Sequence, residues 1–253
     1  MALPTEHGKT AKTMLKMKWN YPVHQLVNLA ASAENSGTVS KAVRRALDQQ
    51  VAFYEVAGKD RRPLLVLREC RLCNGTDDAL LSRAGGNERT LIMTRWFNCV
   101  KLPIEVLEDD HPFAKLFPED HPPHLFLARW DGSNPLALRG DMSRSELTGH
   151  MYEMLKSEYK KPAERVVKDI EKIISQYDVI DERIARLEIS VDSEIEKNGP
   201  ESRKLKKLIA QLKDAEKDMA DNKKKEAKLS VLELKKPDEK PKELDSPMAK
   251  AGL

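Results

Sequence analysis

The feature that most constrains the fold is a heptad pattern in the second half of the chain. Apolar residues recur there at alternating steps of four and three residues for more than three heptads, as in a coiled-coil seam. This first seam comprises Val166, Ile170, Ile173, Tyr177, Ile180, Ile184, Leu187 and Val191. A second seam comprises Leu205, Leu208, Leu212, Ala215, Met219 and Asn222, and reaches Leu229 with Glu226 breaking the pattern. This half of the chain therefore predicts a helical rod.

The two seams are separated by Asn198-Gly199-Pro200, which predicts a turn between two long helices. Gly199 can cap the first helix and Pro200 can start the second. Residues 163–197 carry a net charge of −4 and residues 201–233 a net charge of +3, which favours pairing of the two helices with each other. We expect an antiparallel α-helical hairpin, a coiled coil, over 160–234. An intermolecular coiled coil that forms a homodimer is the alternative.

Residues 39–159 show the mixed periodicities of a globular α/β domain. Helices are predicted at 39–56, 76–84, 87–96 and 143–159, and strands at 63–67 and 97–102, with a β-hairpin over 121–138. Ser143 and Glu146 have the spacing of a capping box at the start of the last helix. The strands are continuous apolar runs, the kind found in sheets that are buried on both faces.

Cys70 and Cys73 form a CxxC directly after the first predicted strand. A CxxC at a strand-to-helix junction, a second strand and a proline-led hairpin about 50 residues later resemble the thioredoxin superfamily, over roughly residues 39–159. Pro123, which precedes the strand HLFLARW, matches the family's cis-proline. The resemblance implies a thioredoxin-like three-layer α/β/α domain.

The same resemblance implies thiol-disulfide oxidoreductase chemistry on protein partners. Cys70 would be the attacking thiolate at a helix N-terminus, and Cys73 would resolve the mixed disulfide. Arg71 and Leu72, between the cysteines, together with Pro122 and Pro123 would contact the substrate. No cofactor is expected.

Two other functions are compatible with the same residues. Glu69 and Arg71-Leu72 differ from the aromatic residue and the Gly-Pro pair of minimal thioredoxins, so the domain can instead belong to a non-catalytic assembly or adaptor protein. Alternatively, Cys70, Cys73, His121 and His124 form a competent zinc-ligand set. Cys99, within a strand, is interpreted as a small buried hydrophobe.

Composition restricts the setting of the protein. The net charge of +3 is small beside 44 basic and 41 acidic residues, so no specific nucleic-acid binding is expected. Three cysteines favour a reducing compartment, and no stretch is long and apolar enough to span a membrane. We therefore expect a cytoplasmic protein, although Ala31-Ser32-Ala33 weakly resembles a signal-peptidase site. Residues 1–38 are predicted to be a flexible arm and residues 235–253 a disordered tail.

Overall fold

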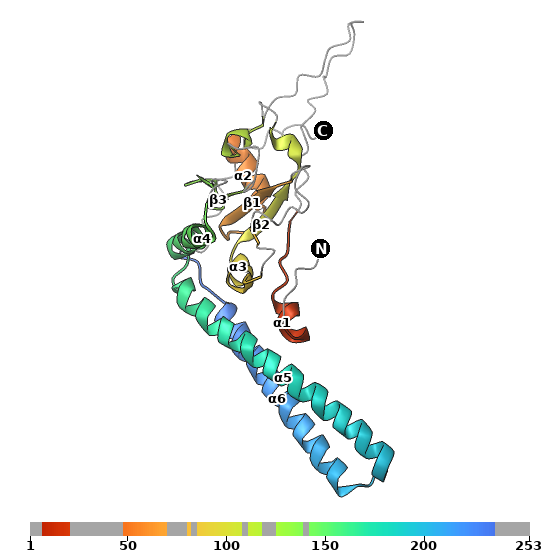
Figure 1. Cartoon of the computed structure of the whole chain (residues 1–253). Coiled ribbons are helices and arrows are strands. Elements are labelled where there is room, and N and C mark those ends of the chain that lie inside the picture. The colour runs from red at the N-terminus through yellow and green to blue at the C-terminus, as the bar shows by residue number, and fades with distance from the viewer. Residues whose placement is uncertain are drawn as a thin grey trace, which may run out of the picture.

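The structure is a computed structural model, and it describes residues 7–20, 48–69, 80–81, 85–107, 111–117, 125–138 and 142–235. These residues form a mixed α/β structure with one four-stranded sheet and six α-helices. Figure 1 shows that the sheet and most of the shorter helices gather in one part, and that two long C-terminal helices project from it. We call residues 48–158 the α/β part and the two long helices the hairpin.

The sheet has the strand order β2-β1-β3-β4. Its strands are β1 (Leu64–Arg68), β2 (Asn98–Leu102), β3 (Leu125–Ala128) and β4 (Leu136–Ala137). β1 and β2 are parallel, whereas β3 is antiparallel to both β1 and β4. Every residue of β1, β2 and β3 is buried, in agreement with their continuous apolar runs.

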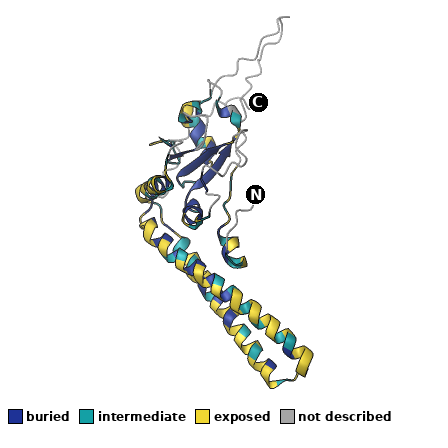
Figure 2. Ribbon diagram, viewed as in Figure 1, coloured by how far each residue is buried: buried dark blue, intermediate teal, exposed yellow. Residues whose placement is uncertain are grey.

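The two faces of the sheet enter separate hydrophobic cores, because successive side chains of a strand point to opposite faces. Leu64 and Val66 belong to the core formed with α2 (Gln49–Ala57) and the 3₁₀ helices η1 (Ile104–Leu107) and η2 (Ala114–Leu116). Leu65 and Leu67 belong to the core formed with α3 (Glu88–Thr94), α4 (Arg144–Glu158) and the first long helix. Figure 2 shows the resulting buried sheet between layers of helix.

Helices α2, α3 and α4 confirm three of the predicted helical regions in the described residues. The Asp48 side chain accepts a hydrogen bond from the Gln50 N–H at the start of α2. At the start of α4, Ser143 and Glu146 form the predicted capping box. Residues 39–47 lie outside the described residues.

The predicted helix over 76–84 is wrong at the only two positions where it can be checked. Leu80 and Leu81 form a turn and a bend rather than a helix, and both are buried. Two adjacent buried leucines anchor the connection, and α3, which starts at Glu88, is the helix described between the parallel strands β1 and β2. Gly85 and Gly86, both with positive φ, separate Leu81 from α3.

The two long helices are α5 (Ala163–Asn198) and α6 (Arg203–Ser230). Gly199 adopts a φ of 77° directly after α5, a conformation that favours glycine. The prediction that Pro200 starts the second helix is wrong. The first helical residue is Arg203, because the Ser202 side chain supplies an N-cap by accepting from the Lys204 N–H.

The helices run antiparallel, and ion pairs join them at matching depths. Arg183 of α5 lies 3.4 Å from Asp218 of α6, and near the turn Glu194 lies 3.1 Å from Lys204. Every position of the two predicted seams is buried or half-buried. The last described residues bend back toward the α/β part, where Lys235 N–H donates to the Glu158 carbonyl at 2.7 Å.

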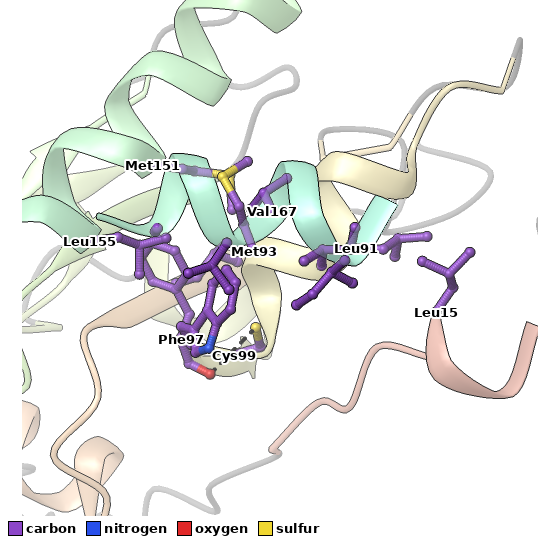
Figure 3. Packing of buried hydrophobic residues seen from close by; sticks show 14 of the residues in the cluster. Leu15, Leu91, Met93, Phe97, Cys99, Met151, Leu155 and Val167 are labelled. Atoms are coloured by element: carbon purple, nitrogen blue, oxygen red, sulfur yellow. Dashed lines mark hydrogen bonds between the residues drawn. The ribbon is translucent and has the colours of Figure 1, made fainter. Parts of the chain in front are cut away.

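Residues 7–20, which we call the strap, lie within the segment predicted as a flexible arm, yet they pack against both parts of the molecule. They include α1 (Lys9–Met14), and Leu15 joins the core shared by α3, α4 and α5 (Figure 3). At its other end, Asn20 N–H donates to the Cys99 carbonyl and the Asn20 carbonyl accepts from Lys101 N–H, both at 2.9 Å. The strap therefore connects the hairpin to the outer edge of β2.

None of the helices within the described ranges combines the length and the apolar character needed to cross a membrane. Residues 236–253, which include most of the predicted disordered tail, lie outside those ranges.

Candidate functional site

The predicted reactive pair follows the carboxyl end of β1. Arg68 is the last residue of that strand, paired with Leu102 at the end of β2. The next residue, Glu69, donates its N–H to the Leu102 carbonyl at 2.8 Å. The chain is thus held on β2 up to the residue before the CxxC. The predicted site residues Cys70, Arg71, Leu72 and Cys73 themselves lie outside the described residues.

The predicted proline segment precedes the start of β3 at the same edge of the sheet. Leu125, the first residue of β3, is paired with Leu67 in β1. The structure therefore brings together the two strand ends that flank the predicted site. His121, Pro122, Pro123 and His124 lie outside the described residues.

Two buried cations lie at this edge on neighbouring strands. The exposed fraction is 3% for Arg68 and 8% for Lys101, and side chains of these types are seldom so deeply buried. The Arg68 guanidinium carbon lies 5.9 Å from the ring centre of Phe117. The Lys101 Nζ lies 5.1 Å from the ring centre of Trp19 in the strap. Both distances permit cation–π attraction.

The alternation of side chains places the two cations on opposite faces of the sheet. Arg68 shares its face with Val66 and the α2 core, whereas Lys101 shares its face with Cys99 and the α3 core. Lys101 was not among the predicted site residues. The signal that could have indicated it is a single charged residue inside the apolar run FNCVKL.

The two buried cations at this edge can stabilise a negative charge on a nearby group, such as a thiolate. Lysine or arginine close to a thiol stabilises the thiolate and lowers the thiol pKa. Glu69 is exposed, so water weakens its opposing effect more than that of a buried charge. The charges described at this edge therefore suit thiolate chemistry.

Cys99 is the third cysteine, and its surroundings are those of an inert thiol. It is 3% exposed, which confirms the interpretation as a small buried hydrophobe. Its Sγ donates to the Thr94 carbonyl at 3.5 Å. Burial raises the pKa of the Cys99 thiol to about 12, and the positive charge of Arg62 only partly offsets this. Cys99 is therefore protonated and unreactive at neutral pH.

No family model, curated protein or solved structure matches this chain. Its chemistry must therefore be inferred from its own residues. In the ranges that the structure describes, no group of three or more His, Cys, Asp and Glu residues could hold a metal ion. The predicted zinc set of Cys70, Cys73, His121 and His124 lies outside those ranges and stays a prediction.

Proposed function

We propose that the protein carries out thiol-disulfide exchange on protein partners through a thioredoxin-like domain, with Cys70 attacking and Cys73 resolving. The observation that carries this proposal is the pairing of Leu67 with Leu125. It joins the strand that leads into the CxxC to the strand that follows the two prolines. The resemblance predicts this neighbourhood, because the family's proline loop packs against its CxxC.

The short chain segments that link this strand pair to Cys70 and to Pro123 support the proximity of these two residues. Cys70 is three residues beyond Leu67, and Pro123 is two residues before Leu125. An extended chain spans at most about 3.6 Å per residue. Cys70 is therefore tethered within about 11 Å, and Pro123 within about 7 Å, of a pair of adjacent strand residues. A substrate chain that contacts Arg71, Leu72, Pro122 and Pro123 can then be presented to Cys70.

The buried cations support the assignment of Cys70 as the nucleophile. Arg68 is two residues before Cys70 and carries its charge out of bulk water, where screening by solvent is weak. We expect the Cys70 thiol pKa to lie below the ordinary value of about 8.5. The order of the reaction then follows: the Cys70 thiolate attacks a substrate disulfide, and the Cys73 thiolate displaces the reduced substrate while forming the Cys70–Cys73 disulfide.

Trapping of the mixed disulfide tests the proposal. The Cys73→Ser variant is mixed with an oxidised, disulfide-containing peptide and analysed by non-reducing mass spectrometry. We expect one peptide bound to Cys70, since the resolving thiol is missing. The matched control is Cys70→Ser/Cys73→Ser, which retains only Cys99 and should bind none. Absence of an adduct on Cys73→Ser, or equal adducts on both variants, would contradict the proposal.

Alkylation kinetics test the role of Arg68. Rates of iodoacetamide modification at Cys70 are followed against pH in the wild type and in Arg68→Met, which keeps an unbranched apolar side chain but removes the charge. We expect the midpoint to move to higher pH in Arg68→Met. Arg61→Met is the matched control, because Arg61 lies before β1, with its guanidinium carbon 4.1 Å from the ring centre of Trp130. An equal shift in both variants would count against a local effect.

A non-catalytic assembly role is the second candidate, and exposed apolar side chains on the hairpin favour it. Val179 and Ile189 of α5 are 66% and 71% exposed. An apolar surface on a long helix suits a partner helix, such as that of a second copy of this chain. Sedimentation of the full chain tests this: we expect a dimer that becomes monomeric in Val179→Glu/Ile189→Glu. A monomeric wild type would remove the homodimer.

A further inference from the structure

A cleft of about 1270 Å³ opens between the strap, the amino ends of β1 and β2, and the hairpin. Its walls are formed by residues within 9–20, 94–99, 177–188 and 219–226, with Arg62 before β1. Its volume slightly exceeds the usual range of small-molecule sites, about 300–1,000 Å³. The CxxC follows the opposite end of β1, so the cleft is separate from the proposed redox site.

The charges around the cleft are predominantly positive. Arg95 is neutralised by Glu226, 2.5 Å away, and Arg62 is paired with Asp60. Four other basic residues line the cleft: Lys9, Lys16, Lys18 and Lys223. All four are exposed, and none forms an ion pair within the described part of the chain.

The carboxylates of the cleft do not balance these lysines. Asp181 already accepts hydrogen bonds from the Thr10 N–H at 2.8 Å and from its hydroxyl at 2.9 Å. Glu188 is the remaining carboxylate of the lining. The four ammonium groups outnumber these two carboxylates, and the excess positive charge attracts an anion.

The interior of the cleft is apolar and includes one hydroxyl without a partner. Met14, Phe97, Ile184 and Met219 line it. Tyr177 also lines the cleft and is 1% exposed, and its hydroxyl forms no hydrogen bond within the described residues. Burial, reinforced by Glu226 and opposed by Arg95, raises the pKa of Tyr177 to about 12. The hydroxyl therefore keeps its proton and can donate. A buried hydroxyl without a partner among the described residues can form a hydrogen bond with a ligand in the cleft.

We propose that this cleft binds a small organic anion, with its carboxylate, phosphate or sulfonate group among the strap lysines and Lys223, and its apolar body against the interior. The anionic group and the apolar body match the two kinds of lining. A small molecule is favoured over a nucleic acid because the four lysines converge on one cleft rather than following an open face with repeated aromatic residues.

Binding of three probes to the full chain tests this inference by calorimetry. The probes are 8-anilinonaphthalene-1-sulfonate, which has both features, inorganic phosphate, which has only the charge, and N-phenyl-1-naphthylamine, which has only the apolar body. We expect the sulfonate to bind with one-to-one stoichiometry and at least tenfold more tightly than the other two. Equal binding of the sulfonate and the uncharged amine would overturn the anion assignment.

Charge reversal locates the binding. Lys18→Glu/Lys223→Glu changes two exposed side chains of the cleft, and we expect the sulfonate to bind at least tenfold more weakly. Lys213→Glu/Lys217→Glu is the matched control, since these exposed lysines belong to α6 but not to the cleft. Circular dichroism checks that all variants are folded. Unchanged affinity in the cleft variant, or equal loss in the control, would overturn the proposed site. These results do not depend on Cys70, which the trapping experiment tests separately.

Discussion

The α/β part and the hairpin are stabilised in different ways. Every residue of the three longer strands is buried, and apolar side chains cover both faces of the sheet. In α5, by contrast, residues 163–180 supply every buried position except one, Glu194 (Figure 2). Near the turn, the seam positions of α5 are half-buried, and α6 contributes only a few buried residues, such as Leu205 and Ala215. Helical periodicity alone therefore does not indicate how strongly a helix is stabilised. The stabilisation depends on how much of the helix contacts the core around the sheet.

The largest expected effect is at Ile170, which is compared with Ile184 on the same seam of α5. Ile170 is fully buried against the α/β part, whereas Ile184 is half-buried. We expect Ile170→Ala to lower the free energy of unfolding by about 4 kcal/mol, because it removes buried methyl groups and leaves a cavity. Ile184→Ala should cost about half as much, since less area is lost from the core. Urea unfolding measures both, and equal losses would contradict the distinction between the part of the hairpin that contacts the α/β part and the part beyond it.

Two glycines compare a tightly packed position of the α/β part with an open one. Gly132 has a φ of 78°, and a Cβ there would lie 2.2 Å from Phe53 Cδ2. Gly132→Ala should therefore cost about 3 kcal/mol through backbone strain and overpacking. Gly149 lies within α4 with open space around it, so Gly149→Ala should stabilise by up to about 1 kcal/mol. Changes in unfolding free energy of the same sign for the two variants would contradict this account.

A smaller effect is expected at the hairpin turn. The Ser202 hydroxyl donates to Glu194 Oε1 at 2.6 Å, and its oxygen caps α6. Ser202→Ala should destabilise by about 1 kcal/mol, the usual cost of a lost N-cap. Ser190→Ala is the control, because Ser190 is exposed within α5 and alanine is the better helix former. Thermal unfolding followed at 222 nm checks both; equal changes would show that the cap is not important.

The sequence predicted correctly those features that depend on interactions between residues close in sequence. The seams, the strands and the capping box of α4 depend on residues close in sequence, and the structure has each of them. The helix predicted over 76–84 failed because Leu80 and Leu81 are drawn into the core from a turn. Pro200 is compatible with a helix start, but the Ser202 cap lies two residues further on.

Long-range contacts could not be read from the sequence. The strap has little apolar periodicity, and it is held by carboxylates about 170 positions away: Gly8 N–H donates to Asp178 Oδ1 at 2.7 Å and Thr10 N–H to Asp181 Oδ2 at 2.8 Å. The sequence likewise indicated a CxxC beside basic residues, but not that Arg68 and Lys101 are buried. Their burial depends on how Phe117 and Trp19 are brought to the sheet.

The strap joins the two parts of the molecule, and His7 makes that joint sensitive to pH. The His7 Nδ1 lies 2.7 Å from Asp178 Oδ2 of α5, and the Nε2 lies 3.2 Å from Glu88 Oε1 of α3. Both ring nitrogens donate only when the imidazole is protonated. Burial by itself lowers the pKa of His7, but the hydrogen bonds and charges of Asp178 and Glu88 outweigh it, so the pKa is raised above 6.5.

The smallest and most specific prediction follows from the raised pKa of His7. A raised pKa means that protonated His7 stabilises the docked strap fully below about pH 6.5, and that this contribution disappears as the pH rises through the higher folded-state pKa. We expect wild type to exceed His7→Gln by less than about 1 kcal/mol at pH 6, since such pairs are weak, and by progressively less toward pH 9. Urea unfolding across this range measures the difference, with His150→Gln on α4 as the control. An NMR titration midpoint of His7 below 6.5 would contradict the assignment, because the two carboxylates would then not favour the imidazolium that holds the strap against both α3 and α5.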